Sequence, residues 1–335
     1  MDPARTREAP PSHPVLPQAH PLLGATLNRY PETWVQGQEG LQVYGPTISV
    51  TDVDCRLLGD VSVEWGRKAE ANWAFRRWRL PRPRHVPGKA LVLASTGGNT
   101  YFHWMTDVLP RIRLARQAGL DPLVFDPILV NGLDQPFQKE TLARFGIFPD
   151  RCLVFSVRES AYELREATLP SLPGIPGVVP PETAEFLKRE FAVSGVPASR
   201  RIFIGRGGAG HRALVQEREI SRELAKRGFE NVECGNLSVR EQAEVFASAE
   251  MVVGAHGAAL TNLVFCRPGT RVIELFSPRY VNPCYRDLCV AAGLRHGAVI
   301  GNGRDWVLST RHDEPSAPIT ASWPLLCDLL AADFA

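Results

Sequence analysis

The chain lacks the apolar runs that membrane-spanning helices require, because no segment reaches roughly 18 uninterrupted apolar residues. Its first 21 residues contain six prolines and several charges, with no apolar stretch of the kind that signal peptides carry. Residues 1–25 are therefore expected to form a disordered leader, and the protein is expected to be cytoplasmic.

Strong charge and cysteine pairs are also missing. A formal net charge of +2 over 335 residues argues against bulk electrostatic binding to nucleic acid. The seven cysteines are odd in number and contain no CxxC pair, which predicts reduced thiols without a disulfide framework or a zinc site. The absence of GxSxG, Walker and HExxH motifs removes several hydrolase, kinase and zinc-protease hypotheses.

What the chain does contain is a regular alternation of predicted strands and helices from residue 89 onward, which is typical of parallel, doubly wound α/β sheets. A proline-rich stretch, residues 169–181, divides this pattern, and the length favours two domains. We predict domains over 26–180 and 181–302. A short β region opens the first of them, and a tail over 303–335 carries a closing helix that is expected to pack on the first domain.

The most informative segment is MVVGAHGAALTNLVF, residues 251–265, which predicts a buried strand, a tight turn carrying His256, and a helix. Such a turn lies beside a helix N-terminus, where backbone N–H groups favour a phosphate. Gly257 lets a ligand approach the backbone closely. A hydrogen-bonded core histidine in an ordinary strand-to-helix turn is the alternative.

A second glycine-rich turn follows the predicted strand over 201–205, and a helix is expected over 212–227. Arg206 and Arg212 flank this turn, and guanidinium groups match the oxygens of a diphosphate. The turn also contains GxGxxG, the fingerprint of dinucleotide-binding proteins. No clear acidic residue follows in the ribose-binding position, so an NAD-dependent oxidoreductase is kept as an alternative.

His103 and Asp107 lie four residues apart in a predicted helix over 101–118, so both project from one face near its start. An imidazole beside a carboxylate is a plausible general-base pair for a sugar hydroxyl. The alternative is that Asp107 only orients His103 in a packed helix. Glu274 lies near the end of another predicted strand, where a carboxylate can accept both ribose hydroxyls; an exposed glutamate is the alternative.

A basic stretch with tryptophans occupies residues 64–85. It could dock on an anionic glycan, a lipid phosphate or a membrane surface, or it could be a solvated face with its tryptophans packed inward. The cationic and tryptophan residues concerned are Arg67, Lys68, Arg76, Arg77, Arg79, Arg82, Arg84, Trp65, Trp73 and Trp78.

Together, the segments GGNTYFHWMTDVLPRI, IFIGRGGAGHRALVQEREI and VVGAHGAALTNLVFCRPGTRVIELFSP resemble the bacterial form of glycosyltransferase family 61, often labelled as capsular polysaccharide biosynthesis proteins. The resemblance implies a GT-B-like fold, with two Rossmann-like domains facing a cleft. It makes the first domain the acceptor side and the second the nucleotide-sugar-binding side. The residues it implicates are His103 and Asp107 as catalytic, with Asp107 as the base, Gly98 and Asn99 on the acceptor side, and Arg206, Arg212, His256, Gly257, Asn262 and Glu274 around the donor.

The resemblance further implies an inverting, metal-independent transfer of a sugar from a nucleotide diphosphate sugar to a hydroxyl of a surface or capsular glycan, free or lipid-linked. It requires no bound cofactor and no nucleic acid. Peripheral contact with the inner membrane through the basic stretch is a further expectation. A non-catalytic glycan-binding subunit remains an alternative to the enzyme.

Overall fold

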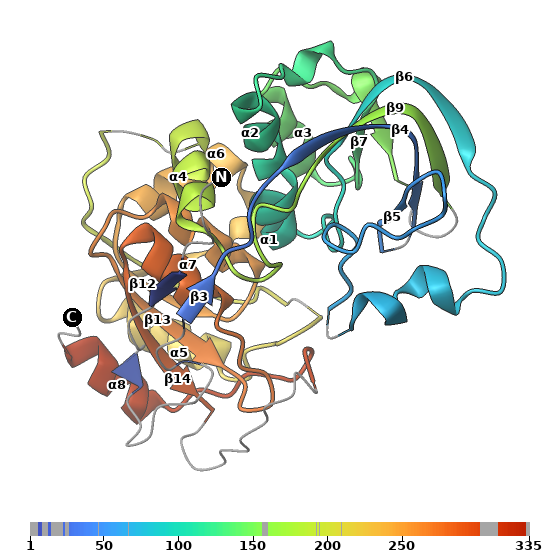
Figure 1. Cartoon of the computed structure of the whole chain (residues 1–335). Helices are drawn as coiled ribbons and strands as arrows, with labels where there is room; N and C mark the ends of the chain where they lie inside the picture. The colour runs from blue at the N-terminus through green and yellow to red at the C-terminus, as the bar shows by residue number, and fades with distance from the viewer. Residues whose placement is uncertain are drawn as a thin grey trace. The chain divides into compact units, whose positions relative to one another are not determined.

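The computed structural model describes residues 6–8, 13–14, 23, 27–45, 47–65, 67–155, 160–191, 193, 195–208, 210–301 and 314–332. The chain divides into two compact units (Figure 1). The first unit spans residues 30–177, and the second spans 178–335 together with 5–29. Most of the expected leader, residues 1–25, and much of the tail lie outside the described residues.

The first unit contains a six-stranded mixed sheet. Four neighbouring strands are parallel, and the long strand β4 pairs with β9 in the antiparallel sense. The expected short β region is therefore not separate from the first domain, because β4 and β5 form one edge of its sheet. In spatial order the strands are β5 (Ser49–Thr51), β4 (Val35–Tyr44), β9 (Ala161–Pro170), β6 (Arg84–Val92), β7 (Ile128–Val130) and β8 (Cys152–Val154).

Helical segments connect the parallel strands of this sheet. After β6 come α1 (Tyr101–His103), the π-helical turn η4 (Trp104–Val108) and α2 (Pro110–Gln117), where a single helix over 101–118 was expected. A proline at the start of α2 is tolerated because the first helical N–H has no intrahelical acceptor. The remaining segments are η2 (Ala69–Ala71), η3 (Trp73–Arg76), η5 (Pro122–Val124), α3 (Pro136–Ala143) and η6 (Pro149–Arg151).

The second unit is built on a six-stranded parallel sheet, which confirms the parallel α/β prediction for this part of the chain. In spatial order the strands are β11 (Phe229–Val232), β10 (Arg200–Ile204), β12 (Ala249–Ala255), β13 (Arg271–Phe276), β14 (Arg295–Ile300) and β2 (His13–Pro14). Two further short strands, β1 (Thr6–Glu8) and β3 (Leu27–Arg29), pair only with each other.

Helices cover both faces of this sheet. On one face, α5 (Glu217–Ala225) and α8 (Trp323–Ala331) pack on a core that includes Phe203, Val253 and Ile273. On the other face, four segments contact one another: α4 (Pro181–Phe191), α6 (Val239–Ala247), η8 (Ala258–Phe265) and α7 (Cys284–Ala292). A short turn, η7 (Cys234–Asn236), precedes α6. No described helix is long and apolar enough to cross a bilayer.

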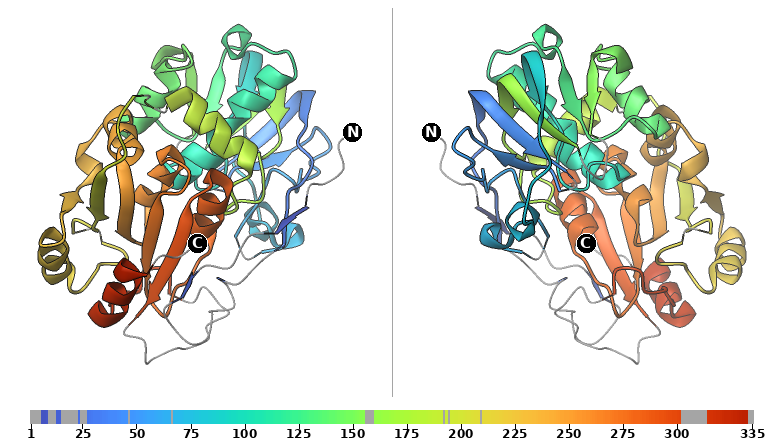
Figure 2. Two further views of the ribbon diagram at one scale, coloured as in Figure 1. Left: turned by 90° about the vertical axis from the view of Figure 1, so that its left-hand side faces the viewer. Right: turned by 90° about the vertical axis from the view of Figure 1, so that its right-hand side faces the viewer.

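The closing helix corrects one expectation. Leu326 and Leu329 of α8 are buried in the core of the second unit, and the helix lies beside β14 (Figure 2). The prediction that it packs on the first domain is therefore wrong. The apolar face of α8 completes the sheet layer that α5 begins, since α5 alone leaves the far strands uncovered.

A buried arginine joins two parallel strands in the first unit. Arg111 is 1% exposed and donates from Nη1 to the carbonyl of Ala94, 2.5 Å away, and from Nε to that of Pro170, 3.0 Å away. These carbonyls follow β6 and close β9. Burial lowers the pKa of Arg111 to about 9, with the charge of Asp107 opposing that shift, so the guanidinium stays charged at neutral pH.

Replacing Arg111 with methionine is expected to lower the free energy of unfolding by about 3 kcal/mol, because two buried carbonyls lose their donor. Urea denaturation measures this change. Arg116→Gln, on the exposed side of α2, is the control and is expected to cost less than about 1 kcal/mol. Equal stability of Arg111→Met and the parent protein would contradict this account.

Candidate functional site

The strand order of the second unit reverses between β10 and β12. The chain proceeds from β10 outward to β11 on one side, and from β12 outward to β13 and β14 on the other. In open parallel sheets, ligands bind beyond the carboxyl ends of the strands at this reversal point. Here those ends carry Arg206 after β10, and His256 and Gly257 after β12.

Arg206 lies directly against Gly257. A Cβ atom added to Gly257 would overlap Nη1 of Arg206. The backbone at Gly257 is extended, with φ of 176°, so its lack of a side chain matters for space and not for conformation. Arg206 also donates from Nη2 to the carbonyl of His211, 2.7 Å away, while its buried Nε has no partner among the described residues.

Arg212 approaches the same turn from a strained backbone position. Its φ is +52°, in the left-handed region that residues with a Cβ rarely adopt. Its Nε donates to the carbonyl of His256 at 3.2 Å and its Nη1 to that of Pro315 at 2.8 Å. The guanidinium carbon lies 5.3 Å from the centroid of the Tyr280 ring. The expected helix start at 212 is wrong, because α5 begins at Glu217.

The guanidinium groups of Arg206 and Arg212 form no ion pair with a carboxylate of the described residues, and the charge of Glu217 acts on Arg206 without such a contact. Burial lowers the pKa of Arg206, and the positive charge of Arg212 lowers it further. Two neighbouring cations without a counter-ion at a sheet's ligand-binding edge are suited to a phosphate or diphosphate.

The backbone of the glycine-rich turn is already occupied. Glu217 Oε1 accepts from the N–H groups of Arg206 and Gly207, at 2.9 and 3.1 Å. Gly205 permits this approach, since a Cβ there would overlap the same carboxylate. These two N–H groups are therefore engaged by Glu217 and do not face a ligand. The dinucleotide fingerprint also requires its last glycine to open a helix, whereas α5 begins seven residues after Gly210.

The buried side chain of Glu274 contacts the His256 ring and holds the turn after β12 in place. It is fully buried, and its Oε1 and Oε2 lie 2.5 Å from His256 Nδ1 and 2.9 Å from His296 Nε2. Burial raises the pKa of Glu274, and Arg212 opposes the rise. With both oxygens engaged and no exposed surface, this carboxylate does not present itself to ribose hydroxyls. Its observed contacts are those of a group that orients His256.

The two histidines contact Glu274 through different ring nitrogens, His256 through Nδ1 and His296 through Nε2. Burial lowers the pKa of His296 to about 3. Its Nδ1 has no hydrogen-bond partner among the described residues, which fits a neutral ring that donates only from Nε2. The ring of His256 stacks on Phe276, with centroids 5.1 Å apart. The described residues contain no cluster of three or more His, Cys, Asp or Glu side chains spaced to hold a metal.

Asn262 lies inside the helical layer. It is fully buried, and its Nδ2 donates to Gln242 Oε1 at 2.6 Å and to the carbonyl of Ala259 at 3.0 Å. These contacts join η8 to α6. The structure therefore places Asn262 behind the His256 turn, where it supports the start of η8.

The first unit brings His103 and Asp107 together as expected. His103 Nδ1 lies 2.6 Å from Asp107 Oδ2, and the side chains are 16% and 5% exposed. Asp107 occupies the π-helical turn η4, a widened helical geometry that is frequent at functional sites. Arg111, one turn further, acts on Asp107 electrostatically. The pair follows the carboxyl end of β6, next to β9, where this sheet also reverses its strand order.

Trp65 stacks on His103, a contact that the sequence alone does not indicate. The ring centroids are 4.7 Å apart with an interplanar angle of 26°, and Trp65 is 53% exposed. Gly97 has φ of +75° and packs against the edges of both rings. Gly98 is buried against Asn131, and Asn99 is exposed at the start of α1.

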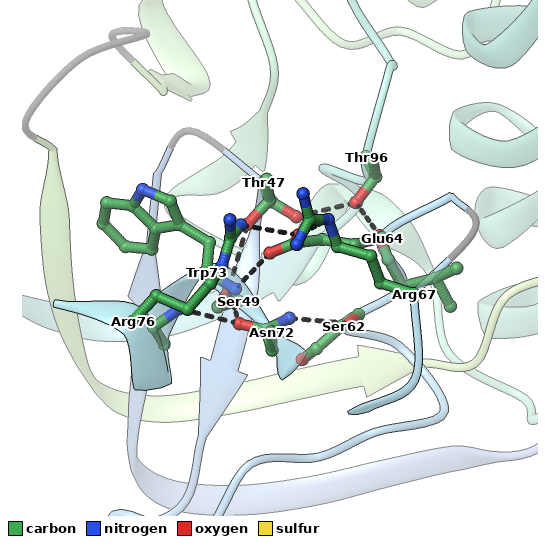
Figure 3. Close-up of polar contacts among 11 residues, drawn as sticks. Thr47, Ser49, Ser62, Glu64, Arg67, Asn72, Trp73, Arg76 and Thr96 are labelled. Atoms are coloured by element: carbon green, nitrogen blue, oxygen red, sulfur yellow. Dashed lines mark hydrogen bonds and ion pairs between the residues drawn. The ribbon is translucent and has the colours of Figure 1, made fainter. Parts of the chain in front are cut away.

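The loop before His103 is tied to the segment that carries Trp65. Thr96 Oγ1 lies 2.6 Å from the carbonyl oxygens of Thr47 and Val63 (Figure 3). The hydroxyl has one proton, so it donates to one of these carbonyls at a time. This contact fixes the position of the loop between β6 and α1 relative to the indole.

Comparison with known proteins gives the family. The sequence model of Glycosyltransferase 61 matches residues 101–273, slightly more than half of the chain. The chain belongs to the glycosyltransferase 61 family. The matched region begins with α1, which carries His103, and ends in β13, directly before Glu274. The matched region therefore contains His103 and Asp107 of the first unit and Arg206, Arg212 and His256 of the second.

Two plant proteins are similar to parts of the chain. The beta-1,2-xylosyltransferase RCN11 of Oryza sativa subsp. japonica is 42% identical over 48 residues, which cover 14% of this chain and 9% of the rice protein. The beta-1,2-xylosyltransferase of Arabidopsis thaliana is 28% identical over 112 residues, which cover 29% of this chain and 21% of the Arabidopsis protein. The chain thus matches less than a quarter of the length of each of these relatives.

Several supporting residues are not apparent from the sequence. Glu217, His296, Arg111 and Trp65 lie 10 to 38 residues from the backbone groups or side chains that they contact in the two sites. The only available signal was chemical: a carboxylate early in a helix for Glu217 and a histidine in an apolar strand for His296. Neither signal identifies a partner.

The free energy of unfolding is expected to fall as the pH is lowered from about 6.5 toward about 3, because His296 stays neutral in the folded protein over this range. The folded pKa of about 3 lies below the unfolded value of about 6.5, so the unfolded chain binds this proton first. The free energy of unfolding therefore decreases by about 1.4 kcal/mol per pH unit from this group as the pH falls below about 6.5. His296→Gln keeps a donor for Glu274 and removes the titration.

Urea denaturation between pH 7 and pH 4 measures the effect as a flatter pH dependence in His296→Gln than in the parent. His85→Gln, at an exposed histidine, is the control and should retain the parent's slope. Identical slopes for the parent and His296→Gln would show that His296 is protonated in the folded protein.

Proposed function

We propose that the chain is a glycosyltransferase that binds a nucleotide diphosphate sugar beyond the carboxyl ends of β10 and β12. The observation that carries this proposal is the pair Arg206 and Arg212, two neighbouring guanidinium groups that form no ion pair with a carboxylate of the described residues. Membership of the glycosyltransferase 61 family supports the same ligand class. The missing side chain at Gly257 makes room for the guanidinium of Arg206, which packs directly against this glycine.

The arginine pair is suited to the chemical step as well as to binding. When the bond between the anomeric carbon and the diphosphate breaks, negative charge accumulates on the diphosphate oxygens. Arg206, Arg212 and the first N–H groups of η8 stabilise that charge without reorganising, because they are already fixed by the surrounding backbone contacts. In this proposal they take the place of a metal ion.

The proposed base is His103, with Asp107 as its positioning partner. The sequence favoured Asp107 as the base, but Asp107 is the more buried of the two and its Oδ2 is engaged by His103 Nδ1. The acceptor hydroxyl gives its proton to Nε2 of His103 while its oxygen attacks the anomeric carbon. Asp107 accepts from Nδ1–H and stabilises the imidazolium that forms. A single displacement of this kind inverts the anomeric configuration.

The sugar transferred is proposed to be a pentose, on the basis of the two plant relatives, which are named as beta-1,2-xylosyltransferases. UDP-xylose is accordingly the first donor to test. The proposed acceptor is a hydroxyl of a surface glycan, which follows from the sequence resemblance to capsular polysaccharide proteins.

Removing either arginine is expected to weaken binding of a nucleoside diphosphate by about 10- to 100-fold, since each loses a charge-assisted hydrogen bond worth about 1.5–3 kcal/mol. Isothermal calorimetry of Arg206→Ala and Arg212→Ala with UDP and GDP measures the loss. The control is Arg218→Ala, an exposed arginine on α5. Gly257→Ala should weaken binding too, by displacing Arg206 while retaining both charges.

The same titrations with EDTA and with Mg²⁺ test metal independence, and NAD tests the oxidoreductase. Binding that requires Mg²⁺ would overturn the metal-independent step. Binding of NAD alone would replace the proposal with the oxidoreductase, and equal affinities for all four variants would place the diphosphate elsewhere.

Replacing His103 with alanine is expected to lower kcat by about 10²- to 10⁴-fold with little change in donor affinity, because the base is lost. Transfer from UDP-xylose to an oligosaccharide acceptor, followed against pH, measures this effect. Asp107→Asn should lower kcat less than His103→Ala and shift the pH at which activity falls, since the imidazolium loses its partner. A complete loss in Asp107→Asn together with retained activity in His103→Gln would make Asp107 the base.

A further inference from the structure

A second feature of the first unit is an exposed aromatic and basic surface around η3. It consists of Phe75, Arg77, Trp78, Arg79 and Arg82, which we term the η3 surface. Trp78 is fully exposed, at 104% of its reference area, and Phe75 is 56% exposed. The alternative in which the tryptophans of this stretch pack inward is therefore wrong for Trp78. Full exposure of the largest apolar side chain has a hydration cost that burial against another surface would relieve.

The segment that carries these side chains is firmly anchored. Asn72 is completely buried, and its Oδ1 accepts from Ser49 Oγ at 2.7 Å, while its Nδ2 donates to the carbonyl of Ser62 at 3.0 Å (Figure 3). Glu64 accepts from the N–H of Trp73 and from Arg76 Nη2. These hydrogen bonds fix the start of η3 and the Arg76 side chain at its end, so the exposed Phe75 lies on an anchored turn and Trp78 follows two residues after it.

The charge of the surface is also local and uncompensated. Residues 64–85 contain seven Lys and Arg against two Glu, whereas the whole chain has a net charge of only +2. Glu64 pairs with Arg67 and Arg76. Within the part of the chain that the structure describes, Arg77, Arg79 and Arg82 form no ion pair. Three cations thus lie beside two exposed aromatic rings.

We propose that the η3 surface docks on an anionic lipid bilayer. Arginines attract the negative surface potential, and Trp and Phe side chains insert at the boundary between headgroups and acyl chains. An anionic polysaccharide would satisfy the arginines, but it gives no reason for an indole that no neighbouring side chain holds. Aromatic rings that recognise sugars are held as fixed platforms, whereas insertion into lipid needs no fixed ring orientation. The proposal uses neither Arg206 nor His103 and is independent of the proposed reaction.

Sedimentation of the full chain with vesicles tests the proposal. Vesicles of phosphatidylcholine mixed with phosphatidylglycerol should bind the protein, and vesicles of phosphatidylcholine alone should bind it much more weakly. Arg77→Gln combined with Arg79→Gln is expected to weaken binding by about 25-fold, at about fivefold per arginine. Trp78→Ala should weaken it by about tenfold through loss of apolar contact. Phe148→Ala, at an exposed aromatic residue outside this surface, should bind like the parent.

Three results would overturn the proposal: no binding to the mixed vesicles, binding that both substituted proteins retain, or binding equally strong to neutral vesicles. Binding to dextran sulfate, a soluble anionic polysaccharide, distinguishes recognition of a polysaccharide from recognition of a bilayer. If dextran sulfate binds the protein and no vesicle does, the surface recognises an anionic polymer and the bilayer assignment is wrong. Unchanged melting temperatures of the variants establish that each is folded, which is expected because every substituted side chain is exposed.

Discussion

The candidate donor site depends on two neighbouring arginine side chains, Arg206 and Arg212, which form no ion pair within the described part of the chain. Their mutual repulsion disfavours the unliganded arrangement, and the protein maintains it with backbone carbonyls and a left-handed backbone at Arg212. Such a pair is unfavourable unless an anion completes it. The missing side chain at Gly257 leaves the space that the guanidinium of Arg206 occupies.

The polar groups behind this pair explain why it can be held. Glu274 fixes His256 and in turn is held by His296, so the turn that accepts from Arg212 rests on a buried hydrogen-bonded chain. Glu217 plays the corresponding part for the turn after β10, where it takes two backbone N–H groups. Carboxylates thus stabilise the backbone of both turns, while neither neutralises the arginines.

The first unit likewise uses buried charged side chains to position the residues of its candidate site. Arg111 joins the ends of β6 and β9, and the π-helical turn places Asp107 between this cation and His103. The imidazole retains the larger exposure of the pair and carries the stacked Trp65 on one face. In each unit, a buried charged residue positions a more exposed one at the carboxyl edge of a parallel sheet.

The sequence by itself determined the α/β class, most strand and helix positions, and the chemical residues at the strand ends, because hydrophobic periodicity and glycine placement are local signals. It also fixed the family through motifs in the region that contains His103, Arg206 and His256. Only the tertiary structure decided that Glu274 is buried between two histidines, that Glu217 occupies the glycine turn, and that Trp78 is exposed. Those facts depend on which side chains meet across strands and loops, and hydrogen-bond partners distant in sequence leave no periodic trace in the chain.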